Sequence, residues 1–128
     1  MAGVIRWLVA SVLVLPLVTA CTSDQDIRVE SPSGRLVVRA ELVLEMIDPT
    51  WDIEVRETTF LGGRWAVGCV SGDDPANELY DDSLRWVDDD TVTIETDRGV
   101  ATLEVARQEI VSDPEGVVGT RVEGVCRG

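Results

Sequence analysis

The stretch that decides the fold class is residues 35–47, Arg-Leu-Val-Val-Arg-Ala-Glu-Leu-Val-Leu-Glu-Met-Ile, in which hydrophobic side chains occupy every even position. The charged side chains of this stretch all stand at odd positions: Arg35, Arg39, Glu41 and Glu45. Successive side chains of a β-strand point to opposite faces, so this alternation puts all of the charge on one face. An α-helix of the same sequence would spread the charges around its circumference. The stretch therefore predicts one long strand whose even-numbered side chains enter a core.

Shorter segments on both sides of this strand repeat the period of two, and turn-forming residues separate them. Residues 31–34, Ser-Pro-Ser-Gly, are typical of a type I turn. The expected strands cover residues 27–30, 35–47, 51–56, 64–70, 83–87, 91–96, 100–105 and 117–126. Residues 106–112 lack clean alternation and fit a loop, a bulge or a short helical turn equally. The pattern predicts an all-β domain, an antiparallel sandwich or a curled sheet of about seven or eight strands.

The composition fits one small acidic domain and excludes several classes of function. The chain has 128 residues, with 24 acidic and 11 basic side chains and a formal charge of −13. Such a charge repels phosphate, so nucleic acid is not an expected partner. Histidine is missing and every basic residue is arginine, which excludes Ser-His-Asp catalysis, imidazole metal ligands and lysine Schiff bases. We expect no enzyme, no catalytic residues and no cofactor.

The first twenty residues have the organisation of a secretory signal peptide. Residues 1–6 contain one arginine, and residues 7–18 form an apolar run that is shorter than the roughly 20 residues needed to cross a bilayer. The run ends in Val18-Thr19-Ala20-Cys21, which resembles the lipobox of bacterial lipoprotein precursors. An ordinary signal peptide followed by a chance cysteine is the alternative.

The lipobox resemblance implies that Cys21 receives lipid and that the chain is cut before it. Residues 1–20 would then be removed, residues 21–26 would form a polar tether, and residues 27–128 would form a single β domain. Two acyl chains give stable attachment, so the expected partner is the lipid bilayer. The expected location is the extracytoplasmic side of a bacterial cell membrane. The mature chain keeps 10 arginines and all 24 acids, a side-chain charge of −14.

The remaining cysteines, Cys69 and Cys126, are an even pair in a chain expected to reach an oxidising compartment. A reactive thiol pair is the alternative, but such pairs usually have the Cys-x-x-Cys spacing, which this sequence lacks. Trp65, Val67 and Cys69 are expected on one apolar face of their strand, and Val118, Val122 and Cys126 on one face of the last strand. The pattern therefore predicts an internal structural disulfide.

Two groups of side chains are candidates for a ligand site. Carboxylates gather between the expected strands at Asp73, Asp74, Glu78, Asp81, Asp82, Asp88, Asp89 and Asp90. Calcium takes six to eight oxygens, but this spacing is not that of an EF-hand, so we expect solvated loop charges and no metal site. The second group is Trp51, Trp65 and Trp86, which are in phase with the apolar faces of their strands. Core packing is therefore favoured over a ligand surface.

A further resemblance rests on residues 31–35, Ser-Pro-Ser-Gly-Arg, and residues 84–94, Leu-Arg-Trp-Val-Asp-Asp-Asp-Thr-Val-Thr-Ile. They are similar to an S-P-D-G-K-like turn and a W-x-D-D-x-T-L-like hairpin in small bacterial lipoproteins of unknown function. Ser33 replaces the usual aspartate and Arg35 the lysine. The resemblance covers roughly residues 30–105 and implies a β fold without implying an activity.

Three functions agree with the sequence. The leading one is a non-enzymatic envelope lipoprotein that presents a binding or structural β domain. The second is an inhibitor or immunity-type lipoprotein whose negative charge attracts a basic protein. The third is a metal-binding or hydrolytic protein built on the aspartate-rich loops.

Overall fold

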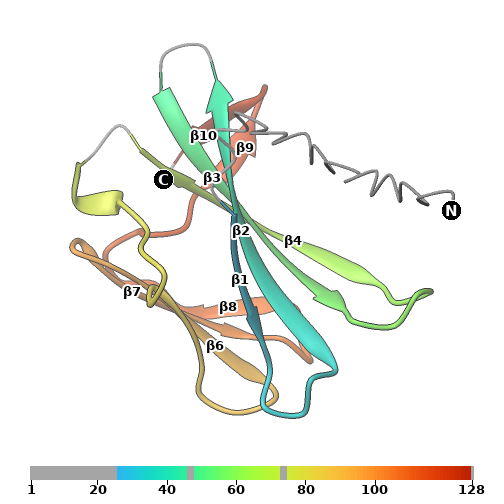
Figure 1. Cartoon of the computed structure of the whole chain (residues 1–128). Helices are drawn as coiled ribbons and strands as arrows, with labels where there is room; N and C mark the ends of the chain where they lie inside the picture. Colours follow the sequence, from blue (N-terminus) through green and yellow to red (C-terminus); the bar gives the residue numbers. More distant parts are fainter. Residues whose placement is uncertain (1–25, 46–47, 73–74, 128) are drawn as a thin grey trace, which may run out of the picture.

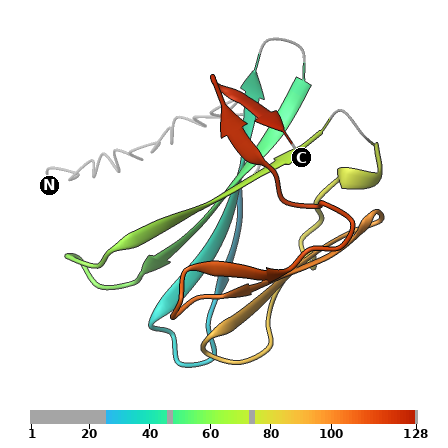
Figure 2. The same cartoon turned by 180° about the vertical axis from the view of Figure 1, so that it is seen from behind.

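Figure 1 shows the computed structural model of the chain, which describes residues 26–45, 48–72 and 75–127. These residues form two four-stranded antiparallel sheets, one two-stranded sheet and a single turn of 3-10 helix, η1 (Pro75–Asn77). The two larger sheets lie against each other as two layers (Figure 2). The predicted all-β antiparallel fold is confirmed. Within the described ranges, no helix has the length and hydrophobicity of a bilayer-spanning segment.

The first sheet contains the stretch that decided the fold class. Its strands are β1 (Asp26–Glu30), β2 (Leu36–Glu45), β3 (Asp48–Glu57) and β4 (Arg64–Ser71), and they pair in that order. Val38 and Ala40 of β2 are fully buried and stand opposite Val55 and Ile53 of β3. The alternation predicted for β2 and β3 is therefore confirmed for the described side chains.

The second sheet faces the first with a row of equally buried side chains. Its strands are β5 (Leu84–Trp86), β6 (Thr91–Thr96), β7 (Gly99–Glu104) and β8 (Glu109–Ser112), again paired in sequence order. The hydrophobic side chains that it buries are those of Leu84, Val92, Ile94, Ala101 and Leu103. The ambiguous residues 106–112 form a turn and β8, and a bulge opposite Thr102 and Leu103 breaks their alternation. Truncating a core leucine of this kind costs about 2–5 kcal/mol.

One edge of the sandwich is closed by a hydrogen bond between the sheets. The indole Nε1 of Trp86 donates to the backbone oxygen of Val29 across 2.8 Å, which joins β5 to β1. Trp51 is buried, and Trp65 and Trp86 pack against the core while remaining partly exposed. The three tryptophans therefore have the packing role that their position in the strands indicates.

The predicted last strand, residues 117–126, is wrong. The chain folds back on itself there and forms a hairpin of β9 (Thr120–Val122) and β10 (Val125–Arg127). Glu123 and Gly124, the two residues between the strands, have φ values of 53° and 80°. A two-residue turn with positive φ at both positions matches the twist of the strands that it connects. Because the turn separates two strands, Val118, Val122 and Cys126 do not share one face of a single strand, as the sequence predicted.

Candidate functional site

The expected attachment point, Cys21, lies outside the described residues. Asp26, the first described residue and one residue before the expected boundary, already belongs to β1 and pairs with Glu41. Five residues of extended chain span at most about 17 Å. A lipid on Cys21 would therefore hold Asp26 within about that distance of the membrane surface.

Cys69 and Cys126 are joined, with an S–S distance of 2.06 Å and Cα atoms 5.9 Å apart. Their position differs from the expected one, because a bulge in β4 opposite Ile53 and Glu54 shifts the register. Beyond the bulge Cys69 stands opposite Asp52, whose side chain faces away from the core. Trp65, Val67 and Cys69 thus do not share one face. The disulfide lies on the outer side of the first sheet, where it ties the β9–β10 hairpin to β4.

The C-terminal segment also pairs with β4 through its backbone. The N–H of Cys69 donates to the oxygen of Gly119 at 3.1 Å, and the N–H of Gly119 donates to the oxygen of Cys69 at 2.7 Å. Arg121 adds a charged hydrogen bond of 2.7 Å from its Nε to Oδ1 of Asp52. These contacts bury Cys69 completely. The geometry therefore suits a structural crosslink and not an exposed redox pair.

The outer face of the first sheet carries a network of charged side chains that we call the arginine face. It consists of Arg28, Arg39, Arg56 and Arg64 with Asp26, Glu41 and Glu54. Arg39 lies at its centre, with Nε 3.0 Å from Oδ1 of Asp26 and Nη1 3.5 Å from Oε1 of Glu54. Arg56 reaches the same Glu54 oxygen at 3.0 Å. Within this network four guanidinium groups meet three carboxylates, and the neighbouring pair of Arg121 and Asp52 adds one charge of each sign.

Charge pairing at the centre of the arginine face changes two pKa values. Partial burial raises the pKa of Asp26, but the hydrogen bonds from Arg39 and Arg28 outweigh this effect and leave it below its ordinary value. The hydrogen bond to Asp26 raises the pKa of Arg39, against the opposing effect of burial. Both groups are therefore held in their charged forms.

A cleft of about 660 Å³ opens between the two sheets beside the β3–β4 hairpin. Its apolar lining comes from Leu36, Val55, Trp65 and Val105, and its polar lining includes Arg35, Arg56, Arg64, Glu57, Asp89 and Asp90. The carboxylates of Asp89 and Asp90 accept backbone N–H groups of Ser33 and Ala106 at 2.8 Å and 2.7 Å. Because these carboxylates hold turns together, the cleft has the chemistry of a binding surface more than that of a proton-transfer site.

The aspartates before β6 are structural, which the sequence did not indicate. Oδ1 of Asp88 accepts the N–H groups of Asp90 and Thr91, both at 2.8 Å. The hydrogen bond from the Ser33 backbone lowers the pKa of Asp89, with smaller contributions from the Ser33 side chain and the Arg35 charge. Asp73 and Asp74 lie outside the described residues. Among the described residues, no three His, Cys, Asp or Glu side chains gather as a potential metal site.

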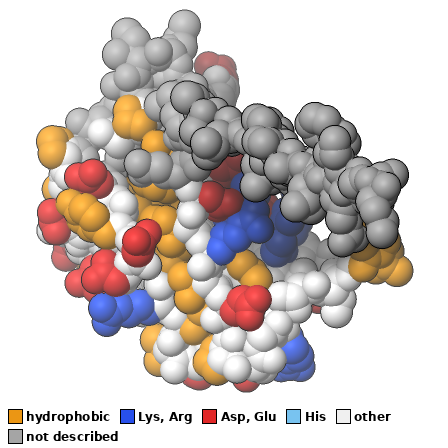
Figure 3. Space-filling model, viewed as in Figure 1, with side chains coloured by type: hydrophobic (Ala, Val, Ile, Leu, Met, Phe, Trp, Pro, Cys, Tyr) orange, Lys and Arg blue, Asp and Glu red, His pale blue; other side chains and the backbone are white. Residues whose placement is uncertain are grey.

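A second charged surface, the acidic patch, surrounds Tyr80. It contains Glu78, Asp81, Asp82, Glu95 and Asp97, which line two shallow pockets with Tyr80. Tyr80 is 49% exposed, and its hydroxyl donates to Oε2 of Glu78 at 3.2 Å. This hydrogen bond, together with the Glu78 charge, raises the pKa of the phenol. In Figure 3 acidic side chains are most frequent at the left, and the central arginines lie beside acidic side chains.

The arginine face could have been inferred from sequence only in part. Arg28, Arg39 and Arg56 stand at outward positions of expected strands, but their grouping depends on the register between strands. Compared with protein families, curated proteins and solved structures, the chain matches none of them.

Proposed function

We propose that this protein is a bacterial envelope lipoprotein, anchored on the extracytoplasmic side of the membrane by lipid on Cys21. It presents a non-enzymatic β-sandwich that binds at the membrane surface. The observation that carries the proposal is the short distance in sequence from the lipobox at residues 18–21 to the first residue of the sandwich, Asp26. A domain tethered so closely remains beside the bilayer that holds it.

Labelling with a fatty-acid probe in a bacterial host tests the anchor. Wild-type protein should incorporate the probe and lose residues 1–20, whereas Cys21→Ser should remain uncleaved and unlabelled. Ser23→Ala, which changes the tether and leaves the lipobox intact, is the matched control and should behave as wild type. Equal labelling of wild type and Cys21→Ser would contradict lipidation of Cys21.

A second candidate function is the neutralisation of a basic protein, and the acidic patch favours it. Exposed aromatic side chains are enriched where proteins bind each other, and the surrounding carboxylates would attract a cationic partner. Egg-white lysozyme is a convenient basic probe. Binding by the mature protein should weaken on Tyr80→Ser with Asp82→Asn and stay unchanged on Glu109→Gln, an exposed acid of β8. Equal loss in both variants would mean that only overall charge attracts the probe.

A further inference from the structure

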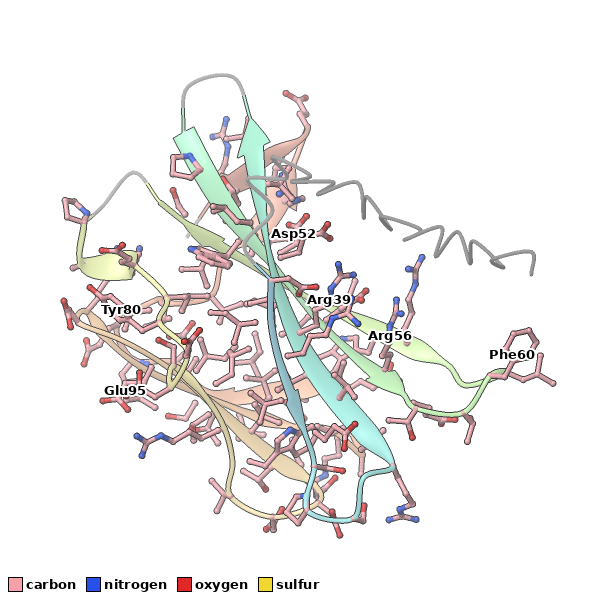
Figure 4. All side chains as sticks on the ribbon, viewed as in Figure 1. Arg39, Asp52, Arg56, Phe60, Tyr80 and Glu95 are labelled. Carbon is pink, nitrogen blue, oxygen red and sulfur yellow. A yellow bond between two sulfur atoms is a disulfide. The ribbon has the colours of Figure 1, made fainter. Side chains whose placement is uncertain are left out.

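The tip of the β3–β4 hairpin carries the two most exposed large hydrophobic side chains in the described part of the chain. Phe60 is 100% exposed and Leu61 is 91% exposed. They are the central residues of a closed turn, because the N–H of Gly62 donates to the oxygen of Thr59 at 2.9 Å. Figure 4 shows Phe60 at the far end of the hairpin, beyond Arg39 and Arg56.

These side chains are unusual for such a turn, and the backbone that carries them is held by hydrogen bonds. Central turn positions usually carry Gly, Pro, Asn, Asp or Ser, which tolerate both the backbone geometry and water. Two further hydrogen bonds fix the base of the tip: Glu57 N–H to the Gly63 oxygen, and Thr58 N–H to the Arg35 oxygen, both at 2.9 Å. The tip is thus a preorganised projection that displays two adjacent apolar groups to solvent.

Arginines flank the tip. Arg64 follows it directly and has a side chain that is 70% exposed, with Glu54 3.9 Å away. Arg35 lies beside it, because Thr58 bonds to the Arg35 backbone and the Arg35 Nε contacts the Ser33 hydroxyl at 3.4 Å. The nearby acids are Glu54, which is already shared with the arginine face, and Glu57, Asp89 and Asp90, which line the cleft with Arg35 and Arg64. The two aspartates accept backbone N–H groups of Ser33 and Ala106. An apolar tip bordered by guanidinium groups is complementary to a lipid surface, where acyl chains lie beneath a layer of phosphates.

The position of the tip relative to the tether fits the same surface. Asp26 is in register with Asp52 through Glu41, and Phe60 is eight residues further along the chain, about 26 Å at a strand's rise. The anchor and the tip would therefore touch one plane at two separated points, with the arginine face between them. The acidic patch lies away from the tip, where Figure 4 shows Tyr80 and Glu95, and it borders the start of β1, because Asp26 lines one of its pockets.

We infer that the tip, residues 58–63, inserts Phe60 and Leu61 into the interfacial region of the bilayer, while Arg35, Arg64 and the arginine face contact lipid phosphates. The inference rests on the proposed membrane anchoring and adds to it a defined orientation. In this orientation the tip and the tether before Asp26 hold the first sheet along the membrane.

The test uses mature protein purified from host membranes and reconstituted into vesicles of phosphatidylglycerol and phosphatidylcholine in equal parts. An environment-sensitive fluorophore is attached at Thr59→Cys, or at Glu95→Cys as the control away from the tip; the disulfide protects Cys69 and Cys126. Spin-labelled lipid should quench the probe at position 59 several-fold more than the probe at position 95. Adding Phe60→Ser and Leu61→Ser should reduce quenching at position 59 to the control level. Val111→Ser, a half-exposed apolar residue of β8, should leave it unchanged.

Equal quenching at positions 59 and 95 in lipidated protein would overturn the inference and leave the lipid anchor intact. A fluorophore at position 59 that is shielded from water in native membranes but not in pure lipid vesicles would also overturn the inference, because the tip would then contact a protein.

Mass spectrometry of the same preparation reports the lipid on Cys21. If that lipid is absent, the proposed anchor fails, and flotation of the unlipidated protein with the vesicles still tests the tip. Flotation lost on Phe60→Ser and Leu61→Ser supports insertion, and flotation that does not depend on these residues contradicts it.

Discussion

The backbone N–H of Ser33 donates a hydrogen bond of 2.8 Å to Oδ1 of Asp89, and so joins the β1–β2 turn of one sheet to the β5–β6 turn of the other. Their contact gives both turns a common structural role, since each holds one end of the sandwich closed. Trp86 closes the same edge nearby through its bond to Val29.

Replacing Asp89 should destabilise the protein in a pH-dependent way. The folded-state pKa of Asp89 is lowered, so its contribution is present above the unfolded pKa of about 3.9 and is lost as the pH falls through the folded pKa. Asp89→Ala should therefore lower the melting temperature at pH 7, and the difference from wild type should shrink in acid. Asp81→Ala, an exposed loop variant, should have no such effect. If the melting temperature of Asp89→Ala lies below that of wild type by the same amount from pH 7 to strongly acidic solution, this role is contradicted.

Trp86→Phe should remove the hydrogen bond to Val29 and keep most of the aromatic packing. The net cost of losing one such bond is about 1 kcal/mol, which corresponds to a fall of roughly 4–8 °C in the melting temperature of a domain of this size. Arg85→Gln changes an exposed neighbour on the same strand and serves as the control. Calorimetry should show this fall for Trp86→Phe and not for Arg85→Gln. A melting temperature of Trp86→Phe equal to that of wild type would show that the Trp86 bond adds nothing.

Loss of the disulfide should lower stability strongly without changing the fold. The crosslink closes a sequence separation of 57 residues, for which chain-entropy models give about 4 kcal/mol. Cys69→Ala with Cys126→Ala should shift the urea midpoint far below that of the oxidised wild type. Wild-type protein in reducing agent is the control, and its urea midpoint should approach that of the double variant. A midpoint unaffected by either treatment would mean that the hydrogen bonds to Gly119 and Asp52 hold the hairpin alone.

Gly68→Ala should displace the C-terminal segment from β4. A Cβ atom at this position would lie 2.5 Å from the Gly119 oxygen and 2.9 Å from Cγ1 of Val118, and the φ of 157° also disfavours a side chain. We expect a lower melting temperature and faster reduction of the Cys69–Cys126 bond by a mild thiol. Gly63→Ala, where a Cβ meets no atom within 4 Å, is the matched control. Unchanged reduction kinetics in Gly68→Ala would show that the segment adapts without strain.

The sequence predicts the two sheets well because each strand buries one face, which places hydrophobic residues at every second position along the chain. It predicts poorly where backbone geometry interrupts that period. The bulge beside Gly68 moves Cys69 to the outer face, and the Glu123–Gly124 turn divides the expected last strand. The arginine face depends on strand register, which a single sequence does not specify, and the structural use of Asp88 and Asp89 depends on neighbours brought close by the fold. Cys21 remains a sequence prediction, because it lies outside the described residues.

The order of strands in space has a consequence for how the chain matures. Each four-stranded sheet joins only sequence neighbours, so its hairpins form early from local contacts. The outer edge of β4 differs, since its partner is Gly119, 50 residues after Cys69. A chain exported N-terminus first presents β4 long before that partner has crossed the membrane. If the chain is exported as proposed, the edge of β4 is open during this interval to pairing with other chains, and the speed of translocation would set how long this risk of aggregation lasts.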